Sequence, residues 1–432
     1  MTCRIGVISL GCAKNLINSE QMMHLLREAG YEVTGETDGV SAVVLNTCGF
    51  IESAKTEAIE TIIELGQMKS DGQIEKLIVT GCLVQRYKDE ILRDLPEIDA
   101  VIGVGSFSEI VSAVRGHQTE FFGSIDAPID ETDRVITGSP LWAYLKIAEG
   151  CDNRCAFCII PNIRGRFRSR ELESILAEAR RLTDRGIREL ILVAQDLTRY
   201  GLDLYGQRRL CDLLTQLCEI PDLKWLRLHY LYPDDIDDNL IRIVADNDKI
   251  LKYLDIPIQH INSGILSKMR RRDFFDIRKL FTKLRREIPD VVLRTSVITG
   301  LPGEGEEEFD ELCEFLSEMK IERAGVFAYS PEDGTPAAAM DRPSADTAMR
   351  RSEIIMELQS RIMDEFNENR VGSTQVVLIE GYDGVDYYGR SFAESPEVDG
   401  YIKVRGANIN ADDFTEIRIV KAEDGEPVGE ML

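Results

Sequence analysis

The chain has 432 residues, 44% of them apolar, and a formal net charge of −25. This length favours two or three domains, and no apolar run approaches the ~18 residues of a membrane span, so we expect no membrane segment. The negative charge disfavours diffuse attraction to nucleic acid and favours a basic partner or simple solubility. Ten cysteines are too few for a disulfide scaffold and the N-terminus has no signal-peptide pattern, so we expect a reducing cytoplasm.

The first segment alternates apolar runs with helical patterns, which predicts a parallel sheet with helices on its faces. Strands are expected at residues 4–10, 41–45 and 76–79, and helices at residues 19–29 and 53–65. Each strand leads into a cysteine, namely Cys12, Cys48 or Cys82. Ligands bind beyond the carboxyl ends of parallel strands, so we expect these cysteines to meet at one edge. Three unrelated buried cysteines are the alternative, and the repeated pattern favours a cluster site.

A second alternating segment follows a polar, acidic stretch at residues 119–138, which predicts a linker. Six strands are expected, at residues 142–148, 189–193, 225–229, 253–257, 293–298 and 324–328, with helices such as 172–185 and 277–287 between them. This pattern predicts a partial (β/α)6 barrel, TIM-like, whose site lies at the carboxyl ends of its strands.

Three cysteines follow the first of these strands, with the spacing C-x3-C-x2-C: Cys151, Cys155 and Cys158. Thiolates this close can converge on one soft metal centre. Structural zinc is bound by four protein ligands, and no fourth cysteine or histidine lies nearby in the sequence. The pattern therefore favours a cubane iron–sulfur cluster with one open iron, where chemistry can take place.

The last part of the chain changes character. Residues 331–369 form a Pro-marked connection and a helix over 347–369, and residues 370–432 are Gly-rich with short alternating strands such as 375–379 and 401–404. This predicts a small antiparallel β-barrel. Residues 371–432 carry five Lys or Arg and thirteen Asp or Glu, a net −8. A barrel with this negative charge should bind RNA poorly and should favour a basic protein as partner.

The C-x3-C-x2-C motif at the start of a barrel resembles the radical S-adenosylmethionine superfamily. The resemblance implies that Cys151, Cys155 and Cys158 ligate a 4Fe–4S cluster, that S-adenosylmethionine binds its open iron, and that reductive cleavage yields a 5′-deoxyadenosyl radical. With Cys12, Cys48 and Cys82 upstream as ligands of a second 4Fe–4S cluster, the whole chain resembles the methylthiotransferases. Matching stretches are residues 9–15, 46–50, 165–170 and 299–304. The implied domains are a cluster domain (1–118), a linker (119–138), a radical barrel (139–330), a connection with a helix (331–369) and a TRAM barrel (370–432).

Within that family, residues 194–201 and 329–336 resemble the branch that modifies an aspartate of a small-subunit ribosomal protein. The implied reaction uses two S-adenosylmethionine molecules. One donates methyl to sulfur held at the first cluster, and the other supplies the radical that takes hydrogen from the aspartate β-carbon. An external electron donor is implied, and the sulfur source stays open. Transfer-RNA adenosine as substrate is one alternative, and a two-cluster electron carrier without catalysis is another.

Further candidate residues lie outside the cysteine groups. Gln195 and Asp196 follow a strand at the reactive edge and are candidates to contact S-adenosylmethionine. Arg227 and Arg294 are candidates for its carboxylate, because Arg binds carboxylates bidentately; packing or an ion pair is as plausible for each. The arginines at 164, 166, 168 and 170 are candidates to orient an anionic substrate, with a solvated basic loop as the alternative.

Overall fold

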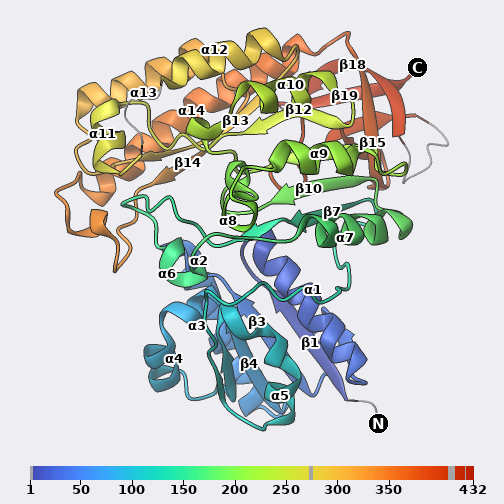
Figure 1. Cartoon of the computed structure of the whole chain (residues 1–432), viewed down its shortest axis with the longest axis vertical. Helices are drawn as coiled ribbons and strands as arrows, with labels where there is room; N and C mark the ends of the chain where they lie inside the picture. Colours follow the sequence, from blue (N-terminus) through green and yellow to red (C-terminus); the bar gives the residue numbers. More distant parts are fainter. Residues whose placement is uncertain (1–2, 272–275, 407–413, 424) are drawn as a thin grey trace.

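The computed structural model describes residues 3–271, 276–406, 414–423 and 425–432. Three bodies follow one another along the chain (Figure 1): an N-terminal α/β domain, a central half-barrel, and a C-terminal β-barrel. Within these described residues no helix is both long and apolar enough to cross a membrane.

The N-terminal domain is a six-stranded parallel sheet in the order β2-β1-β3-β4-β5-β6. Its strands are β1 (Arg4–Ser9), β2 (Glu32–Thr34), β3 (Ala42–Thr47), β4 (Lys76–Gly81), β5 (Ala100–Ile102) and β6 (Glu120–Phe121). Its helices are α1 (Ala13–Glu28), α2 (Glu52–Ser70), α3 (Cys82–Arg86), α4 (Lys88–Asp94), η1 (Val104–Glu109) and α5 (Ile110–Arg115). Every residue of β3 is buried, as expected of an inner parallel strand covered on both faces. β6 lies within the range expected to be a linker, and it pairs with β5 as the sixth strand.

The central domain is an open parallel sheet in the order β14-β13-β12-β11-β10-β7, which confirms the predicted partial barrel. The six strands are β7 (Trp142–Lys146), β10 (Glu189–Val193), β11 (Trp225–Leu228), β12 (Ile250–Asp255), β13 (Val292–Thr299) and β14 (Arg323–Ala328). A short antiparallel pair, β8 (Ala148–Glu149) with β9 (Arg168–Ser169), extends from β7. The other elements are α6 (Ile160–Arg164), α7 (Leu172–Asp184), η2 (Leu197–Arg199), α8 (Leu202–Tyr205), α9 (Leu210–Cys218), η3 (Pro233–Asp235), α10 (Asp238–Asp246), α11 (Ser263–Lys268), α12 (Ile277–Glu287) and α13 (Glu306–Met319).

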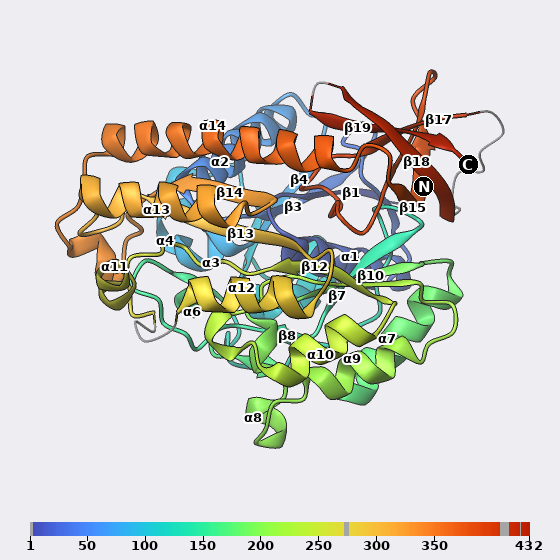
Figure 2. The same cartoon turned by 90° about the horizontal axis from the view of Figure 1, so that it is seen from above.

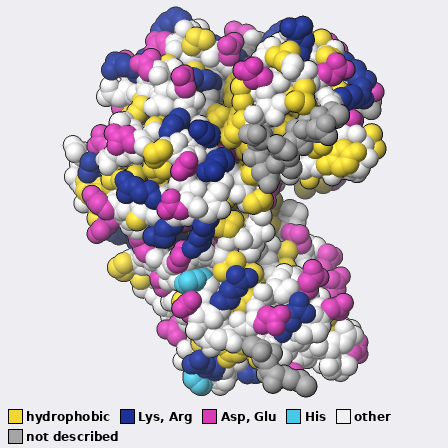
Figure 3. Space-filling view, turned by 90° about the vertical axis from the view of Figure 1, so that its right-hand side faces the viewer, with side chains coloured by type: hydrophobic (Ala, Val, Ile, Leu, Met, Phe, Trp, Pro, Cys, Tyr) yellow, Lys and Arg dark blue, Asp and Glu magenta, His cyan; other side chains and the backbone are white. Residues whose placement is uncertain are grey.

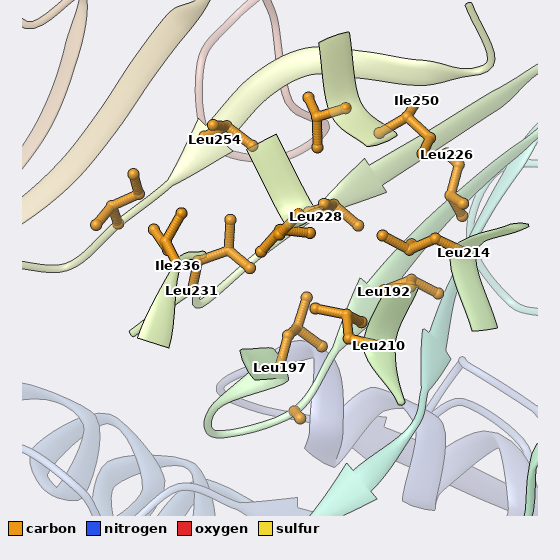
Figure 4. Packing of buried hydrophobic residues seen from close by; sticks show 14 of the residues in the cluster. Leu192, Leu197, Leu210, Leu214, Leu226, Leu228, Leu231, Ile236, Ile250 and Leu254 are labelled. Atoms are coloured by element: carbon orange, nitrogen blue, oxygen red, sulfur yellow. The ribbon is translucent and has the colours of Figure 1, made fainter. Parts of the chain in front are cut away.

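Leucine-rich helix faces attach these helices to the outside of the half-barrel (Figure 4). On α9, buried leucines recur at helical spacing, at positions 210, 213, 214 and 217. They pack against strand residues such as Leu192 and Leu226. Full burial of each leucine stabilises the fold by about 2 kcal/mol. This outer layer holds the strands in place, so their carboxyl ends are a rigid platform for the loops that follow.

After η4 (Pro336–Ala339) the chain continues into the 25-residue helix α14 (Ala345–Asn369), which packs alongside β14 (Figure 2). The last domain is a closed five-stranded barrel in the order β15-β16-β17-β19-β18. Its strands are β15 (Thr374–Tyr382), β16 (Tyr387–Arg390), β17 (Ile402–Arg405), β18 (Phe414–Glu423) and β19 (Glu426–Met431). The barrel was expected to be antiparallel, and four of its five pairings are, but β17 and β19 run parallel.

Candidate metal centres

The first cysteine group gathers at the carboxyl edge of the N-terminal sheet. Cys12 precedes α1, Cys48 follows β3, and Cys82 opens α3 directly after β4. The loops approach closely at Gly11, whose φ is +92° and where an added Cβ would lie 2.7 Å from the Cβ of Cys48. Burial raises the pKa of Cys48 to about 11, and repulsion from the Cys82 and Cys12 thiolates adds to this rise. The structure thus brings together the three cysteines that the strand pattern singled out.

The second group lies at the carboxyl end of the half-barrel, in the loop after β8. Its members are Cys151, Cys155 and Cys158, and the N–H of Cys158 donates to the carbonyl of Cys155 at 3.0 Å. Burial raises the pKa of Cys151 to about 12, with a further rise from Asp196 and Cys155. The residue before the motif, Gly150, has a φ of +78°, and a Cβ there would lie 2.0 Å from the Arg166 carbonyl oxygen.

The donor chemistry of both groups fits iron–sulfur clusters. All ten cysteines are free thiols, and among the described residues no three His, Cys, Asp or Glu side chains are arranged to hold a single metal ion. A cubane cluster does not require donors that meet at one point, because each thiolate binds a different iron. Thiolates are the ligands that such clusters use. The raised pKa values of the Cys48 and Cys151 thiols mean that cluster binding must drive their deprotonation.

One arginine touches a thiol in each group. The Arg164 guanidinium donates to Sγ of Cys82 at 3.3 Å, and that of Arg271 donates to Sγ of Cys155 at 3.9 Å. Sequence reasoning placed Arg164 in a substrate-orienting or solvated loop and did not single out Arg271. The second contact spans 116 residues of sequence, so no local spacing could reveal it.

Arg164 also joins the two groups to each other. It lies at the end of α6, which packs beside α3 (Figure 1). One terminal nitrogen of its guanidinium donates to Oδ1 of Asn15, three residues after Cys12, and the other donates to Glu149 at 3.0 Å. Glu149 stands two residues before Cys151. One buried cation therefore spans the space between the two sets of thiols.

Glu149 is the acceptor around which this region is organised. It accepts hydrogen bonds from Arg164 (3.0 Å), Lys146 (3.1 Å) and Gln195 (2.8 Å). Burial alone would raise its pKa, but the Arg164 and Lys146 cations hold the pKa of this carboxyl well below its usual range. The Oε1 atom of Gln195 is buried and has no hydrogen-bond partner among the residues that the structure describes. A buried acceptor without a partner can accept a hydrogen bond from a bound ligand.

The other expected contacts with S-adenosylmethionine have protein partners. Asp196 accepts from the Thr198 N–H at 3.0 Å and from Asn153 at 2.7 Å. Arg294 donates to Asp255 at 2.8 Å. Arg227 is fully buried, donates to Glu189 at 2.7 Å and to the carbonyl of Phe392 in the C-terminal barrel at 2.9 Å. These contacts favour an interdomain role for Arg227, while Asp196 shapes the loop beside the second cysteine group.

Of the remaining arginines in the predicted loop, Arg170 is also buried, with Glu178 at 2.6 Å. Arg168 donates to the backbone carbonyls of residues 164 and 166. Arg164 and Arg170 are thus internal structural cations, and the solvated basic loop does not describe them.

Comparison with known proteins places this arrangement in a class. Residues 145–316 match the radical SAM superfamily, residues 371–432 match the TRAM domain, and residues 4–103 match a family described as uncharacterized protein family UPF0004. A solved radical S-adenosylmethionine methyltransferase, TsrM from Kitasatospora setae with cobalamin and a [4Fe–4S] cluster bound, is 14% identical with a TM-score of 0.58. The likeness covers 78% of this chain and 77% of that one, and it supports the fold alone. The central part of the chain is a radical SAM domain.

Curated relatives narrow the class to a family. The ribosomal protein uS12 methylthiotransferase RimO of Acetivibrio thermocellus is 42% identical, over 100% of this chain and 99% of the relative. The RimO proteins of Clostridium perfringens and Alkaliphilus oremlandii are 44% and 45% identical over 99% of this chain, and over 97% and 98% of their own lengths. The chain belongs to the RimO family.

Proposed function

We propose that the chain is an enzyme that attaches a methylthio group to the β-carbon of an aspartate in ribosomal protein uS12, with two 4Fe–4S clusters and S-adenosylmethionine. The observation that carries this proposal is the buried Arg164, which donates to Cys82 of the first cysteine group and to Glu149, two residues before the second group. One cysteine group and its cluster account for radical generation. Sulfur transfer requires in addition a place to hold the sulfur, and the second cysteine group would supply it.

Cys12, Cys48 and Cys82 would hold the first cluster, and Cys151, Cys155 and Cys158 the second, where S-adenosylmethionine binds the open iron. When bound, these groups supply a 5′-deoxyadenosyl radical able to take hydrogen from an unactivated C–H bond. Gln195 would accept from S-adenosylmethionine through its Oε1, and Arg294, which also donates to Asp255, would bind its carboxylate. The ionised Glu149 fixes Arg164 and Lys146, and all three residues are buried, which would exclude water from this part of the site.

A protein substrate agrees with the charge of the molecule. The net −8 of residues 371–432 opposes RNA phosphate and attracts a basic ribosomal protein. On the face shown in Figure 3, cationic side chains are interspersed with anionic ones and do not form one continuous basic surface. We further propose that the reductant is an external electron donor and that the enzyme works in the cytoplasm.

The ligand assignment is tested by anaerobic reconstitution. The wild-type chain should bind about eight irons, and C12A/C48A/C82A and C151A/C155A/C158A about four each. Cys211→Ala is the matched control, because Cys211 packs against the core of the half-barrel and should leave the iron content unchanged. About four irons in the wild type would contradict a two-cluster enzyme.

The reaction is tested by mass spectrometry of uS12 after incubation with enzyme, reductant and S-adenosylmethionine. The expected result is a gain of one methylthio group on one aspartate, with release of 5′-deoxyadenosine. Incorporation of label into transfer RNA instead would assign the adenosine substrate. Absence of 5′-deoxyadenosine would indicate an electron carrier.

A further inference from the structure

Lys14 is a buried lysine beside the first cysteine group. It is the second residue of α1 and only 7% of it is exposed. Its ammonium lies 3.8 Å from the centre of the Tyr230 ring. Within the described part of the chain, no hydrogen bond or ion pair joins it to a carboxylate, and the first turn of α1 contains no acidic residue.

This isolation distinguishes Lys14 from four other cations of the same region, each of which has a carboxylate partner. Lys146 and Arg164 share Glu149, Arg227 is paired with Glu189, and Arg294 with Asp255. A cation taken out of water without a counter-ion is costly, and the face of an aromatic ring compensates only in part. Lys14 is therefore a buried cation that no carboxylate of the described residues neutralises.

No carboxylate of the described residues forms an ion pair with Lys14, and the other groups that face it are neutral or shared with the proposed cluster. His229 is neutral, because burial and the Arg227, Arg294 and Lys14 cations lower its pKa well below the usual value. The thiol of Cys12 is close enough for its charge to interact with Lys14, but it is one of the proposed cluster ligands.

Lys14 lies beside the carboxyl ends of the half-barrel strands. Tyr230 comes just after β11, and its carbonyl accepts from the N–H of Leu197 in the loop that carries Gln195 and Asp196. Tyr230 has a φ of +63°, a left-handed conformation that non-glycine residues adopt at some energetic cost and often at functional sites. The Lys14–Tyr230 pair thus lies between the first cysteine group and the end of the barrel that holds the second.

We propose that Lys14 is the receptor for the side-chain carboxylate of the substrate aspartate. The proposal rests on the function proposed above, since the reacting β-carbon is bonded directly to that carboxylate. An ion pair with Lys14 would hold the β-carbon between the two cysteine groups, and the pair is charge-assisted and desolvated. Lys14 then distinguishes aspartate from a neutral residue of the same shape.

The test compares Lys14→Met and Lys14→Arg with wild type in the reconstituted enzyme. The affinity for uS12 is measured by fluorescence anisotropy, with the natural aspartate and with asparagine in its place. Lys14→Met should weaken binding of the aspartate form by about tenfold to a hundredfold and leave binding of the asparagine form unchanged. Lys14→Arg should retain part of the affinity. S-adenosylmethionine affinity and iron content should not change.

The matched control is Lys88→Met. Lys88 also lies over an aromatic ring, that of Phe122, but it is paired with Glu120. It should bind uS12 like wild type.

Three outcomes would overturn the proposal. Weaker binding of S-adenosylmethionine with unchanged uS12 affinity would assign Lys14 to the carboxylate of S-adenosylmethionine. Loss of iron or an altered cluster spectrum, with unchanged uS12 affinity, would mean that Lys14 only balances the charge of the cluster. An equal loss for both forms of uS12 would exclude carboxylate recognition. Wild-type enzyme that does not modify uS12 would instead refute the proposed function, so the two failures are distinguishable.

Discussion

At the scale of single residues, Arg164 is the side chain that joins the two candidate clusters. It donates to Sγ of Cys82 and to Glu149, and it is almost fully buried. Hydrogen bonds to cluster sulfurs, and nearby charge, are among the factors that set the reduction potential of an iron–sulfur cluster. Since a cation that donates to a ligand sulfur favours the reduced, more negative state, Arg164 should raise the potential of the first cluster.

Arg164→Gln is therefore expected to lower the midpoint potential of that cluster, and Arg164→Lys to lower it less because the charge is kept. The measurement is an EPR-monitored redox titration in the C151A/C155A/C158A background, where only the first cluster remains. Arg168→Gln is the control, because the Arg168 side chain donates to backbone carbonyls and touches neither cysteine group. An unchanged potential in Arg164→Gln would leave Arg164 a purely structural role.

At the scale of elements, the loop after β14 holds the first cysteine group in place. Glu332 is buried and accepts from Arg86 of α3 at 2.6 Å and from Lys55 of α2 at 3.2 Å. Arg86 also donates to the carbonyl of Gly49, the residue after Cys48. The loop at residues 329–336, singled out in the sequence for its resemblance to one branch of the family, thus joins two domains.

Glu332→Gln should destabilise the docking of the N-terminal domain by about 3 kcal/mol, since the largely buried Arg86 loses its counter-ion and Lys55 keeps only the exposed Glu52. Urea unfolding monitored by hydrogen exchange in α3 measures this loss. Glu120→Gln removes the half-exposed partner of Lys88 and should change stability by less than about 1 kcal/mol. Equal effects of both substitutions would argue against the interdomain role of Glu332.

The loop before the second cysteine group offers another prediction. Gly150→Ala combines a positive φ with a Cβ placed 2.0 Å from the Arg166 carbonyl oxygen, so the loop must move. We expect the variant to retain about four irons of about eight. Gly206→Ala also replaces a glycine of positive φ, +70°, but nothing lies within 4 Å of its added Cβ. It should keep the full iron content, which separates the clash from backbone strain alone.

At the scale of the whole molecule, buried ion pairs attach the C-terminal barrel to the rest of the chain. Glu189 of β10 pairs with Arg227 of β11 and with Arg390 of β16, and all three side chains are fully buried. Glu394, in the loop after β16, pairs with Arg370 at 2.6 Å and Arg323 at 3.4 Å. The barrel is therefore held in a defined orientation on the half-barrel.

These pairs give the docking a pH dependence. Burial alone would raise the pKa of Glu394, but Arg370 and Arg323 outweigh it and hold the pKa at about 2, below its ordinary value of 4.5. Because the folded pKa is the lower one, the carboxylate contributes stability above about pH 4.5, and this contribution is lost as the pH falls toward 2. The difference in unfolding free energy between wild type and Glu394→Gln should therefore shrink by about 3 kcal/mol over that range. A difference independent of pH would contradict this assignment.

Much of the architecture was predictable from local pattern. All six strands of the half-barrel form where apolar runs alternate with helical periods, because an inner parallel strand must be apolar throughout. Strands β2, β5 and β6 have only three, three and two residues, too few to show any period. The parallel pairing of β17 with β19 also escaped prediction, since a strand's sequence does not encode its partner.

The sequence by itself determined the six cysteines, their grouping by strand end and by spacing, and the acidic charge of the C-terminal barrel. It could do so because these features depend on neighbouring residues and on the shared edge of parallel strands. Only the tertiary structure decided which cations face the cysteines: Arg164 donates to Cys82, Arg271 donates to Cys155, and Lys14 lies over the ring of Tyr230. Such contacts join residues far apart in the chain and depend on how the domains pack, which no local pattern records.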